Sequence, residues 1–213
     1  LLAFKLELPF CSGYGLTETA PVLSVGKVGM YKAKSCGILN EMYMEYRIDS
    51  PNPKEIAGEL HCRGGQVFAG YYKNPEATAK AFTADGWFKT GDLGLIDDER
   101  NLFLVGRCKS MILSTNGQNI FPEEIEVVLN ELPYVAESIV VDRDSKIIAL
   151  IVPDSDAAAH DNLNAETLNE LMNKNIAHLN TKIPQYSQVA GFELHFEPFA
   201  KTPKGSIKRF MYK

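Results

Sequence analysis

Two hydroxyls and a carboxylate follow a glycine turn near the start of the chain, in the segment GYGLTET at 13–19. Thr17 and Thr19 supply the hydroxyls, and Glu18 supplies the carboxylate. A flexible loop of this kind can hold a phosphate through hydroxyl and amide donors, and a glutamate can hold Mg²⁺, which prefers hard oxygen ligands. The same residues can also form a threonine-rich turn that caps itself. Their spacing alone favours the self-capping turn, and both interpretations stay open.

A second candidate is the carboxylate of Asp92, in the Thr-Gly-Asp turn of WFKTGDLG at 87–94. A carboxylate accepts hydrogen bonds from both hydroxyls of a vicinal diol, as a ribose presents, at roughly 1.5 to 3 kcal/mol per bond to a charged group. Capping of the turn after Gly91 explains the same residue equally well. The sequence therefore leaves Asp92 between a sugar ligand and a turn cap.

Three basic residues lie where they could act on a bound anion or sugar. Arg107 follows Gly106 at the end of a predicted strand. It could reach the same sugar as Asp92 or simply pair with an acid. Lys109 and Lys208, taken by themselves, look like solvated surface charges.

The elements that must position these residues in the first half are predicted to be mainly strands, forming a small antiparallel sheet or barrel. The opening residues before Pro9 and the segments 37–49 and 56–64 are rich in β-forming residues. A short helix is predicted to follow Asn74, a good capping residue, with Pro75 at its first position. A hairpin with a polar turn at 97–101 completes this half.

The second half is predicted to be a small α+β unit of three strands and two helices. A strand at 110–113 leads through the tight turn STNGQN to a helix that opens at Pro122. Strands at 137–143 and 146–153 surround a turn, and a second helix begins near Asn164. A last strand at 192–199 leads into a locally basic tail.

Composition and charge exclude several classes of protein. With 45% hydrophobic and 23% charged residues, the chain has the composition of an ordinary soluble globular protein. A net charge of -5 and a pI near 5.5 argue against a nucleic-acid partner, because phosphate-backbone affinity needs a clustered positive face. No apolar run approaches the ~20 residues that span a bilayer. The opening residues lack the unbroken apolar segment of a signal peptide and an initiating methionine, so we expect the chain to begin inside a longer protein.

Cysteines and histidines are too scattered to indicate a metal site or a disulfide framework. The chain has 4 cysteines and 4 histidines, and no pair has the spacing of metal ligands. We therefore expect reduced thiols and structural histidines.

Three segments, in order, resemble the later motifs of the adenylate-forming superfamily, which includes acyl-CoA synthetases, luciferases and peptide-synthetase adenylation domains. They are GYGLTETAP at 13–21, GWFKTGDLG at 86–94, and GRCKSMILSTNGQNIFPEEIE at 106–126. The intervening GELHCRGGQVFAGYYKNPEATAKAF is also similar, so the resemblance covers essentially the whole chain. NGQNIFPEEIE and KTPKGSIKRF most resemble the motifs of bacterial long-chain fatty acid CoA ligases.

The resemblance implies an AMP-forming ligase that uses ATP, Mg²⁺ and CoA. Such enzymes convert ATP and a carboxylate to an acyl-adenylate and pyrophosphate, after which the small domain rotates and the CoA thiol displaces AMP. A long-chain fatty acid is the expected substrate. A ligase for another carboxylate in the same superfamily is one alternative. The other is that the isolated chain is a non-catalytic nucleotide-binding, CoA-binding or interaction module.

Residue roles follow from the same resemblance. Tyr14 resembles the aromatic residue beside the adenine, Thr17 the catalytic hydroxyl that contacts phosphate, and Glu18 the catalytic carboxylate that holds Mg²⁺. Asp92 resembles the aspartate that binds the ribose. Arg107 resembles the arginine that contacts the same sugar.

In the second half, the resemblance places the hinge of the small domain at Lys109, where a change of backbone dihedrals swings the domain. Gly117 resembles the glycine that approaches the pantetheine tunnel. The family's final motif usually has a catalytic lysine where this chain has Ser206. If the tail is extended, Lys204 and Lys208 share a face with Ser206, about 7 Å away along the strand, and we choose Lys208 as the substitute.

The resemblance also implies the domain organisation. Residues 1–107 are expected to be the end of the large nucleotide-binding domain, of α/β class with a small antiparallel β-barrel-like subdomain. Residues 108–213 are expected to be the small mobile α+β carboxyl-terminal domain, with a three-stranded sheet and helices. The family's phosphate loop has no match here, so the expected partner is the amino-terminal part of the same protein. A cytoplasmic location is implied, with peripheral contact at the inner membrane surface as an open alternative.

Overall fold

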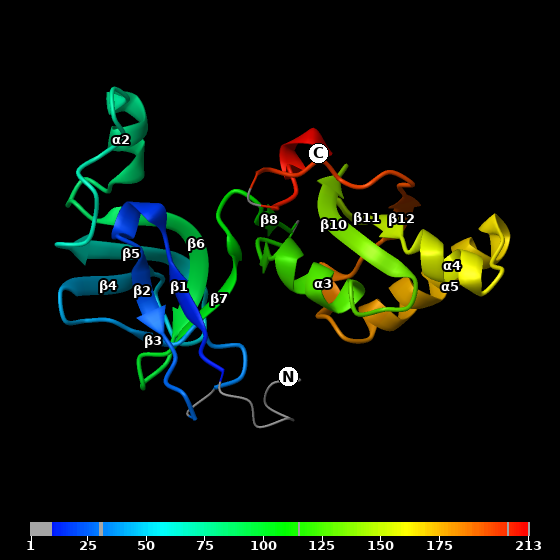
Figure 1. Cartoon of the computed structure of the whole chain (residues 1–213), viewed down its shortest axis with the longest axis horizontal. Coiled ribbons are helices and arrows are strands. Elements are labelled where there is room, and N and C mark those ends of the chain that lie inside the picture. The colour runs from blue at the N-terminus through cyan, green and yellow to red at the C-terminus, as the bar shows by residue number, and fades with distance from the viewer. Residues whose placement is uncertain (1–9, 30–31, 115, 204, 213) are drawn as a thin grey trace. The chain divides into compact units, whose positions relative to one another are not determined.

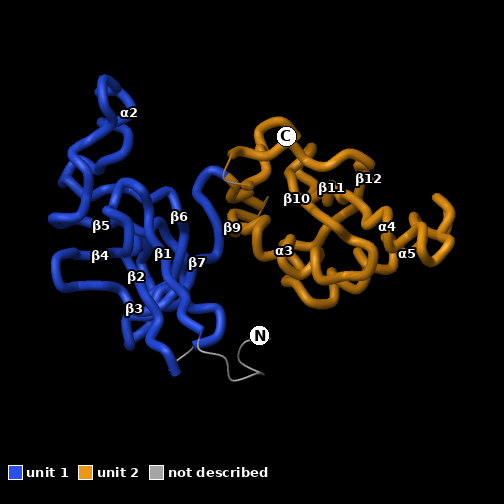
Figure 2. The backbone as a smooth tube through the Cα atoms, viewed as in Figure 1, with its two compact units in different colours: residues 1–109 blue, residues 110–213 orange. Residues whose placement is uncertain are grey.

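The structure of the chain is a computed structural model that describes residues 10–29, 32–114, 116–203 and 205–212. It consists of two compact units, Leu1–Lys109 and Ser110–Lys213 (Figure 2). The predicted domain boundary after residue 107 lies close to this division. The roles assigned to the two halves, a part of a large domain and a mobile small domain, stay predictions.

The first unit is built around a four-stranded antiparallel sheet in the order β4-β5-β6-β7 (Figure 1). Along β4, buried and more exposed residues alternate, because successive side chains of a strand point to opposite faces. The sequence predicted either a sheet or a barrel. β4 and β7 are the two edges of the sheet, so the described strands form an open sheet and no closed barrel. The strands are β4 (Met44–Asp49), β5 (Gly58–Gly64), β6 (Phe88–Ile96) and β7 (Leu102–Arg107).

A smaller three-stranded sheet, in the order β1-β2-β3, shares its core with this larger sheet. Leu23 and Leu39 are its buried hydrophobic residues, and they pack with the buried side chains of β4, β5 and β6. Its strands are β1 (Gly13–Gly15), β2 (Val22–Val25) and β3 (Ile38–Leu39), with the short 3-10 helix η1 (Thr17–Thr19) between the first two. The strand predicted before Pro9 lies outside the described residues.

Local turn and capping chemistry in the first unit agrees with the sequence. The helix α2 (Pro75–Ala81) begins after Asn74, whose Oδ1 accepts a hydrogen bond from Ala77 N at 3.0 Å. The hairpin between β6 and β7 turns at 97–101, where Asp97 Oδ1 accepts bonds from the backbone amides of Glu99 and Asn101. Both predictions are confirmed.

The second unit contains a three-stranded sheet in the order β10-β11-β12. Strands β10 (Val135–Arg143) and β11 (Lys146–Pro153) form an antiparallel hairpin, and β12 (Gly191–Leu194) pairs in parallel with β11. The hairpin turns through Asp144 and Ser145, with φ of 51° and 61°, the left-handed conformation that suits the twist of a two-residue hairpin turn. The predicted three-stranded α+β unit is confirmed; the parallel pairing was not predicted.

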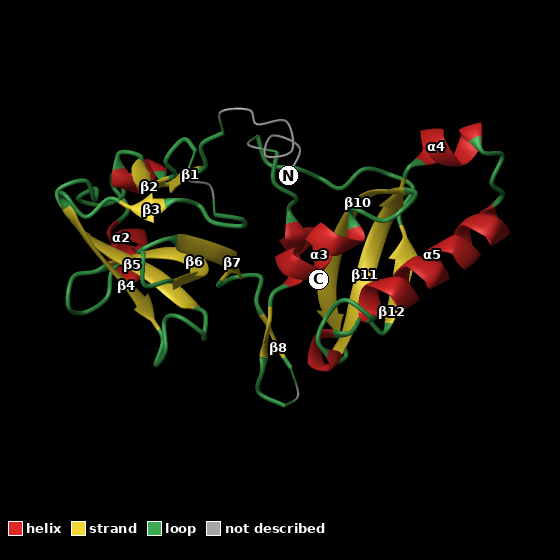
Figure 3. Cartoon of the chain, turned by 90° about the horizontal axis from the view of Figure 1, so that it is seen from below, coloured by secondary structure: helices red, strands yellow, loops and turns green. Residues whose placement is uncertain are grey.

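Two helices, α3 (Pro122–Leu129) and α5 (Ala165–Asn180), pack their apolar sides on one face of this sheet (Figure 3). Leu129, Met172 and Leu179 are fully buried there. α5 begins after Asn164, whose Oδ1 accepts from Thr167 N at 2.8 Å. The short helix α4 (Ser155–His160), which the sequence reading missed, precedes α5. Among the described helices, none is long and apolar enough to cross a membrane.

The opposite face of this sheet is covered by the carboxyl-terminal tail. Phe199 is buried among β10 and β11 side chains, and Tyr212 packs against its ring at 5.0 Å. The Tyr212 hydroxyl accepts a hydrogen bond from Ala200 N at 2.8 Å. The tail thus returns on itself through Tyr212, which directly follows the short 3-10 helix η3 (Arg209–Met211).

A buried ion pair ties this tail to α3. Glu126 is 6% exposed, and its Oε1 accepts hydrogen bonds from Arg209 Nη1 and from Val140 N, each at 2.6 Å. Arg209 also donates to the second carboxylate oxygen. Burial raises the pKa of Glu126 although Arg209 opposes the shift. The carboxylate therefore depends on these donors to remain charged.

Replacing Arg209 by alanine should destabilise the second unit by about 3–5 kcal/mol at pH 7, because it leaves a buried carboxylate without its cation. The pKa of Glu126 should then rise further. The folded state would take up a proton before the unfolded state does, so the deficit should shrink as the pH falls toward about 5. Hydrogen exchange of β10 amides would measure this, since the single tryptophan, Trp87, lies in the first unit.

The matched control is the pair of changes Arg209→Ala with Glu126→Gln, which removes the titrating group. A deficit of equal size at pH 7 and pH 5 in the single variant would contradict this account of the ion pair.

Candidate functional site

A bulge in the middle of β6 creates the site. Opposite β5, Glu59 pairs with Leu93 and His61 pairs with Lys89, so the residues 90–92 face Leu60 alone. Gly91 has a φ of 75°, which favours glycine. The bulge turns the chain so that Asp92 ends opposite Arg107 on β7.

Thr90 closes the bulge with its hydroxyl. Thr90 Oγ1 donates to the carbonyl oxygen of Leu60 at 2.8 Å and accepts from Asp92 N at 3.1 Å. Thr90 is 8% exposed, so water reaches little of this part of the strand. The backbone groups that lose their ladder partners at the bulge therefore need a partner within the protein. The hydroxyl thus replaces ladder bonds that the bulge removes. The sequence reading gave Thr90 no role, although its place two residues before Asp92 was the available signal.

Tyr14 and Arg107 hold the carboxylate of Asp92. The Tyr14 hydroxyl donates to Oδ2 at 2.6 Å, and Arg107 Nε lies 2.9 Å from Oδ1. Asp92 is 4% exposed, whereas the Arg107 side chain is 64% exposed. The structure therefore brings together three residues that the sequence singled out, from β1, β6 and β7. The alternative that Arg107 pairs with an acid is confirmed, and its partner is Asp92.

Tyr14 acts as a permanent donor in this group. Burial, followed by the charge of Asp92, raises the pKa of the Tyr14 phenol well above its usual range. The hydroxyl therefore holds its proton more strongly than an ordinary phenol does, and it donates that proton to the carboxylate of Asp92. A carboxylate offers about four acceptor positions, which leaves Asp92 able to orient a diol while it accepts from Tyr14.

The threonines of the loop after β1 have separate roles. Thr19 is fully buried, and its Oγ1 donates to Leu16 O at 3.0 Å and accepts from Leu16 N at 3.1 Å. Thr17 is exposed. The self-capping turn that the spacing favoured is thus made by Thr19, and Thr17 lies on the surface of the same loop. Gly15 is required there, since an added Cβ would lie 1.6 Å from Pro21 O.

Glu18 is half-buried and oriented by Tyr71. Its Oε1 accepts from the Tyr71 hydroxyl at 3.0 Å, and its backbone oxygen accepts from Phe68 N at 2.8 Å. Within the described ranges, no three His, Cys, Asp or Glu side chains gather as a metal site. Mg²⁺ is usually held by one or two carboxylates together with substrate phosphates and waters. Glu18 therefore fits one ligand of such a site, completed by a phosphate.

The junction and its hairpin hold Lys109 and Gly117. Lys109 is the last residue of the first unit. Gly117 lies between β8 (Ile112–Leu113) and β9 (Asn119–Ile120), with a φ of 76°. An added Cβ at Gly117 would meet no atom within 4 Å, so the backbone conformation favours glycine and packing leaves the position open.

Lys208 was chosen as the substitute for the lysine missing at Ser206 on the condition that the tail is extended. The tail is not extended. The chain turns at Gly205, with a φ of 83°, and Thr202 N donates to Ser206 O at 2.8 Å. The assumed strand is wrong because this turn interrupts it. Lys204 lies outside the described residues. Lys208 is half-buried just before η3, and its role stays a prediction. Lys208 and Gly117 belong to the second unit, and Tyr14, Thr17, Glu18, Asp92 and Arg107 belong to the first.

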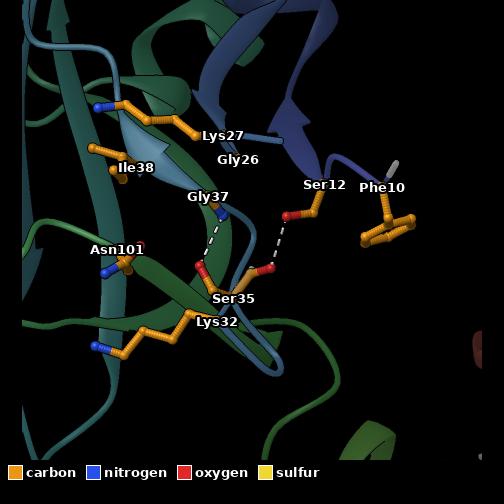
Figure 4. Close-up of a pocket in the computed structure, with 9 residues that line it drawn as sticks. All are labelled: Phe10, Ser12, Gly26, Lys27, Lys32, Ser35, Gly37, Ile38 and Asn101. Atoms are coloured by element: carbon orange, nitrogen blue, oxygen red, sulfur yellow. Dashed lines mark hydrogen bonds between the residues drawn. The ribbon is translucent and has the colours of Figure 1, made fainter. Parts of the chain in front are cut away.

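A small pocket beside β3 is separate from these residues (Figure 4). Ser35 forms part of the pocket wall. The backbone oxygen of Ser35 accepts from Ser12 Oγ at 3.0 Å, and Ser35 Oγ accepts from Gly37 N at 2.9 Å. Lys32, which also lines it, pairs with Asp97 at 2.6 Å. These polar groups satisfy one another, so the pocket carries no candidate chemistry.

The ionisation of Tyr14 offers a test of the site's geometry. The pKa of an ordinary tyrosine phenol is about 10. A titration of tyrosinate absorbance should therefore show no contribution from Tyr14 at about this pH. We expect the difference between the native chain and Tyr14→Phe to stay flat there, and Asp92→Asn should move the pKa of Tyr14 downward. Tyr72→Phe, which removes an 88% exposed ring, is the matched control. A full tyrosinate signal from Tyr14 near pH 10 would contradict the geometry.

Comparison with known proteins shows what this chain is similar to. The AMP-binding enzyme C-terminal domain family matches residues 109–212. A long-chain-fatty-acid–CoA ligase of Mycobacterium bovis is 39% identical over 153 residues, which cover 70% of this chain and 24% of that protein. The 4-coumarate–CoA ligase 2 of Oryza sativa subsp. japonica is 31% identical over 192 residues, covering 82% of this chain and 33% of that protein. The chain thus spans between 24% and 33% of the length of these two relatives.

Solved structures of other CoA ligases are also similar to this chain. The o-succinylbenzoate CoA synthetase of Bacillus subtilis, in complex with AMP, matches with a TM-score of 0.77 and 26% identity, over 100% of this chain and 42% of that one. The anthranilate CoA ligase in complex with anthranoyl-AMP has a TM-score of 0.80 at 24% identity, over 99% of this chain and 40% of that one, and shows the fold alone. By these matches the chain belongs to the adenylate-forming superfamily, and its residues 109–212 are an AMP-binding enzyme C-terminal domain.

Proposed function

We propose that this chain is part of an ATP-dependent, AMP-forming ligase that activates a long-chain fatty acid as an acyl-adenylate and transfers the acyl group to CoA. The observation that carries the proposal is the buried carboxylate of Asp92, oriented by Tyr14 at 2.6 Å and by Arg107 at 2.9 Å. A fixed, charged acceptor is what recognition of a ribose diol requires.

Asp92 would accept both ribose hydroxyls, and Arg107 would move aside or share the sugar. The exposed guanidinium covers an otherwise buried carboxylate, so its motion would admit the diol. Tyr14, half-buried beside the carboxylate, would place its ring next to the adenine. The three residues together would hold the nucleoside part of ATP and of the acyl-adenylate.

Thr17 and Glu18 would act on the phosphates. The exposed Thr17 hydroxyl would donate to a phosphate oxygen, and Glu18, already oriented by Tyr71, would hold Mg²⁺. The cation would neutralise the charge that develops as pyrophosphate leaves. Such displacement depends mainly on positioning and on charge neutralisation, which is why few reactive side chains are needed.

The second half-reaction would use the second unit. Lys109 would act as the hinge, and Gly117, with open space around its α-carbon, would lie along the path of pantetheine. Lys208 would supply the cation that Ser206 cannot. Rotation at Lys109 would exchange the groups that face the acyl-adenylate, so that CoA can attack it.

The acyl substrate has two candidates. The 39% identity to a long-chain-fatty-acid–CoA ligase supports a fatty acid. The match to a 4-coumarate–CoA ligase covers more of this chain, 82% against 70%, and favours an aryl carboxylate as the second candidate. Rates of acyl-CoA formation with the two acids, in the ligase that contains this chain, would decide between them.

A cytoplasmic location is part of the proposal, with peripheral membrane contact as its alternative. Four free thiols, at Cys11, Cys36, Cys62 and Cys108, suit a reducing compartment.

Replacing Asp92 by alanine should weaken AMP binding by this chain about a hundredfold, because two charge-assisted hydrogen bonds are lost. Isothermal calorimetry with AMP would measure the change, and CoA in a parallel titration would report on the second unit. Asp49→Ala removes an exposed carboxylate at the end of β4 and is the matched control. If the native chain binds no AMP, it is a structural or interaction module instead.

Replacing Lys109 by proline should impair thioester formation more than adenylate formation in the ligase that contains this chain. Proline fixes φ near −65°, so one of the two conformations at the hinge is lost. A tenfold larger effect on the second step, about 1.4 kcal/mol of barrier, is expected from acyl transfer and pyrophosphate exchange measured separately. Lys109→Ala keeps the backbone free and is the control. Equal loss in both steps would remove the hinge assignment.

A further inference from the structure

We propose that Glu59 is a positioning residue for Asp92, and that it links the nucleotide site to the junction at Cys108. The proposal rests on the proposed function, because it assumes that Asp92 binds the ribose. Glu59 touches no group assigned to the substrate, so its effect on the nucleotide would pass through the backbone of Gly91.

Glu59 satisfies an amide that the bulge in β6 removes from the sheet ladder. Glu59 Oε1 accepts from Gly91 N at 2.9 Å, across a gap of 32 residues in the sequence. Gly91 precedes Asp92 directly, so this bond fixes the peptide group between Thr90 and Gly91, one residue before the carboxylate of Asp92. Without it, a partly buried amide would lack its partner, and the bulge could relax toward other conformations.

The second oxygen of Glu59 is held from the opposite side. His61 Nε2 lies 3.2 Å from Glu59 Oε2, and the His61 ring is 3% exposed. Arg47 Nε donates to His61 Nδ1 at 3.3 Å, so the ring proton lies on Nε2 and is donated to Glu59. Arg47 is in turn held by Asp85 at 2.8 Å. Both oxygens of Glu59 therefore have directed donors, which leaves the carboxylate one orientation.

The same residue, Gly91, is also bound from the junction. Cys108 N donates to Gly91 O at 2.9 Å, which extends the pairing of β6 and β7 beyond Arg107. Burial, and then the nearby carboxylate of Glu59, raises the pKa of the Cys108 thiol to about 11. Gly91 is thus held at its nitrogen by Glu59 and at its oxygen by the residue before Lys109. A shift of Glu59 would be felt by both Asp92 and the junction.

AMP affinity tests this role in the chain as it stands. Glu59→Ala should weaken AMP binding about tenfold, or 1.4 kcal/mol. Glu59→Gln should weaken it less, because its amide oxygen can still accept from Gly91 N. Glu45→Ala, which removes an exposed carboxylate of β4 paired with Arg63, should leave AMP affinity unchanged.

The reactivity of Cys108 supplies a second readout, which tests the link between Glu59 and the junction. Loss of the negative charge in Glu59→Gln should lower the pKa of the Cys108 thiol. Alkylation of the Cys108 peptide by iodoacetamide, followed by mass spectrometry across a pH series, should therefore begin at lower pH in this variant. This measurement uses the isosteric change, so it tests the link to the junction even if Glu59→Ala fails to fold, and the AMP affinity of Glu59→Gln then tests the positioning of Asp92.

The outcomes separate the two proposals. If Asp92→Ala abolishes AMP binding while both Glu59 variants bind like the native chain, the positioning role is wrong. If the Cys108 profile is identical in Glu59→Gln, the link to the junction is wrong. If the native chain binds no AMP, the proposed nucleotide site fails, and the Cys108 profile still tests the contact made by Glu59.

Discussion

The first unit depends on keeping one carboxylate charged at a depth where water reaches little of it. Donors converge on the carboxylate of Asp92 from strands that are far apart in the sequence, as a buried polar group requires. The bulge in β6 turns the carboxylate toward them, and Thr90 satisfies backbone groups that the bulge displaces. The regular pairing of the sheet is thus interrupted at one point, where the buried carboxylate of Asp92 is held by its donors.

The second unit also contains a buried carboxylate that is held by donors from distant segments, that of Glu126. Its carboxylate receives Arg209 from the tail and the amide of Val140 from β10. In each unit, a buried acid joins segments that the chain order separates. These acids fix which strands and tails lie together, and the apolar cores on either side supply most of the burial.

Local chemistry was predictable from the sequence, and long-range pairing was not. Asn74 and Asn164 cap their helices, and Asp144 and Ser145 form the hairpin turn, because each acts on residues within one turn of itself. The bulge at 90–92 depends on Glu59, a strand away. No periodicity reports that contact, and the parallel pairing of β11 with β12 is hidden for the same reason.

The candidate site was predictable only in part. Motif resemblance found Tyr14, Asp92 and Arg107. It gave no role to Thr19, whose part in the turn depends on burial. Nor could it find the turn at Gly205, because glycine at that position is compatible with both a strand and a turn.

The hydrogen bonds on either side of Lys109 have a mechanical consequence. Cys108 is bound to Gly91 through its amide, and Ser110 Oγ donates to Glu123 Oε1 at 2.6 Å. The connection between the two anchored positions is therefore a single residue long. So short a connection has only a few sterically allowed backbone wells. Reorientation of one unit relative to the other would therefore switch between a few discrete backbone conformations of Lys109. A continuous range of orientations would require one of the two hydrogen bonds to break first.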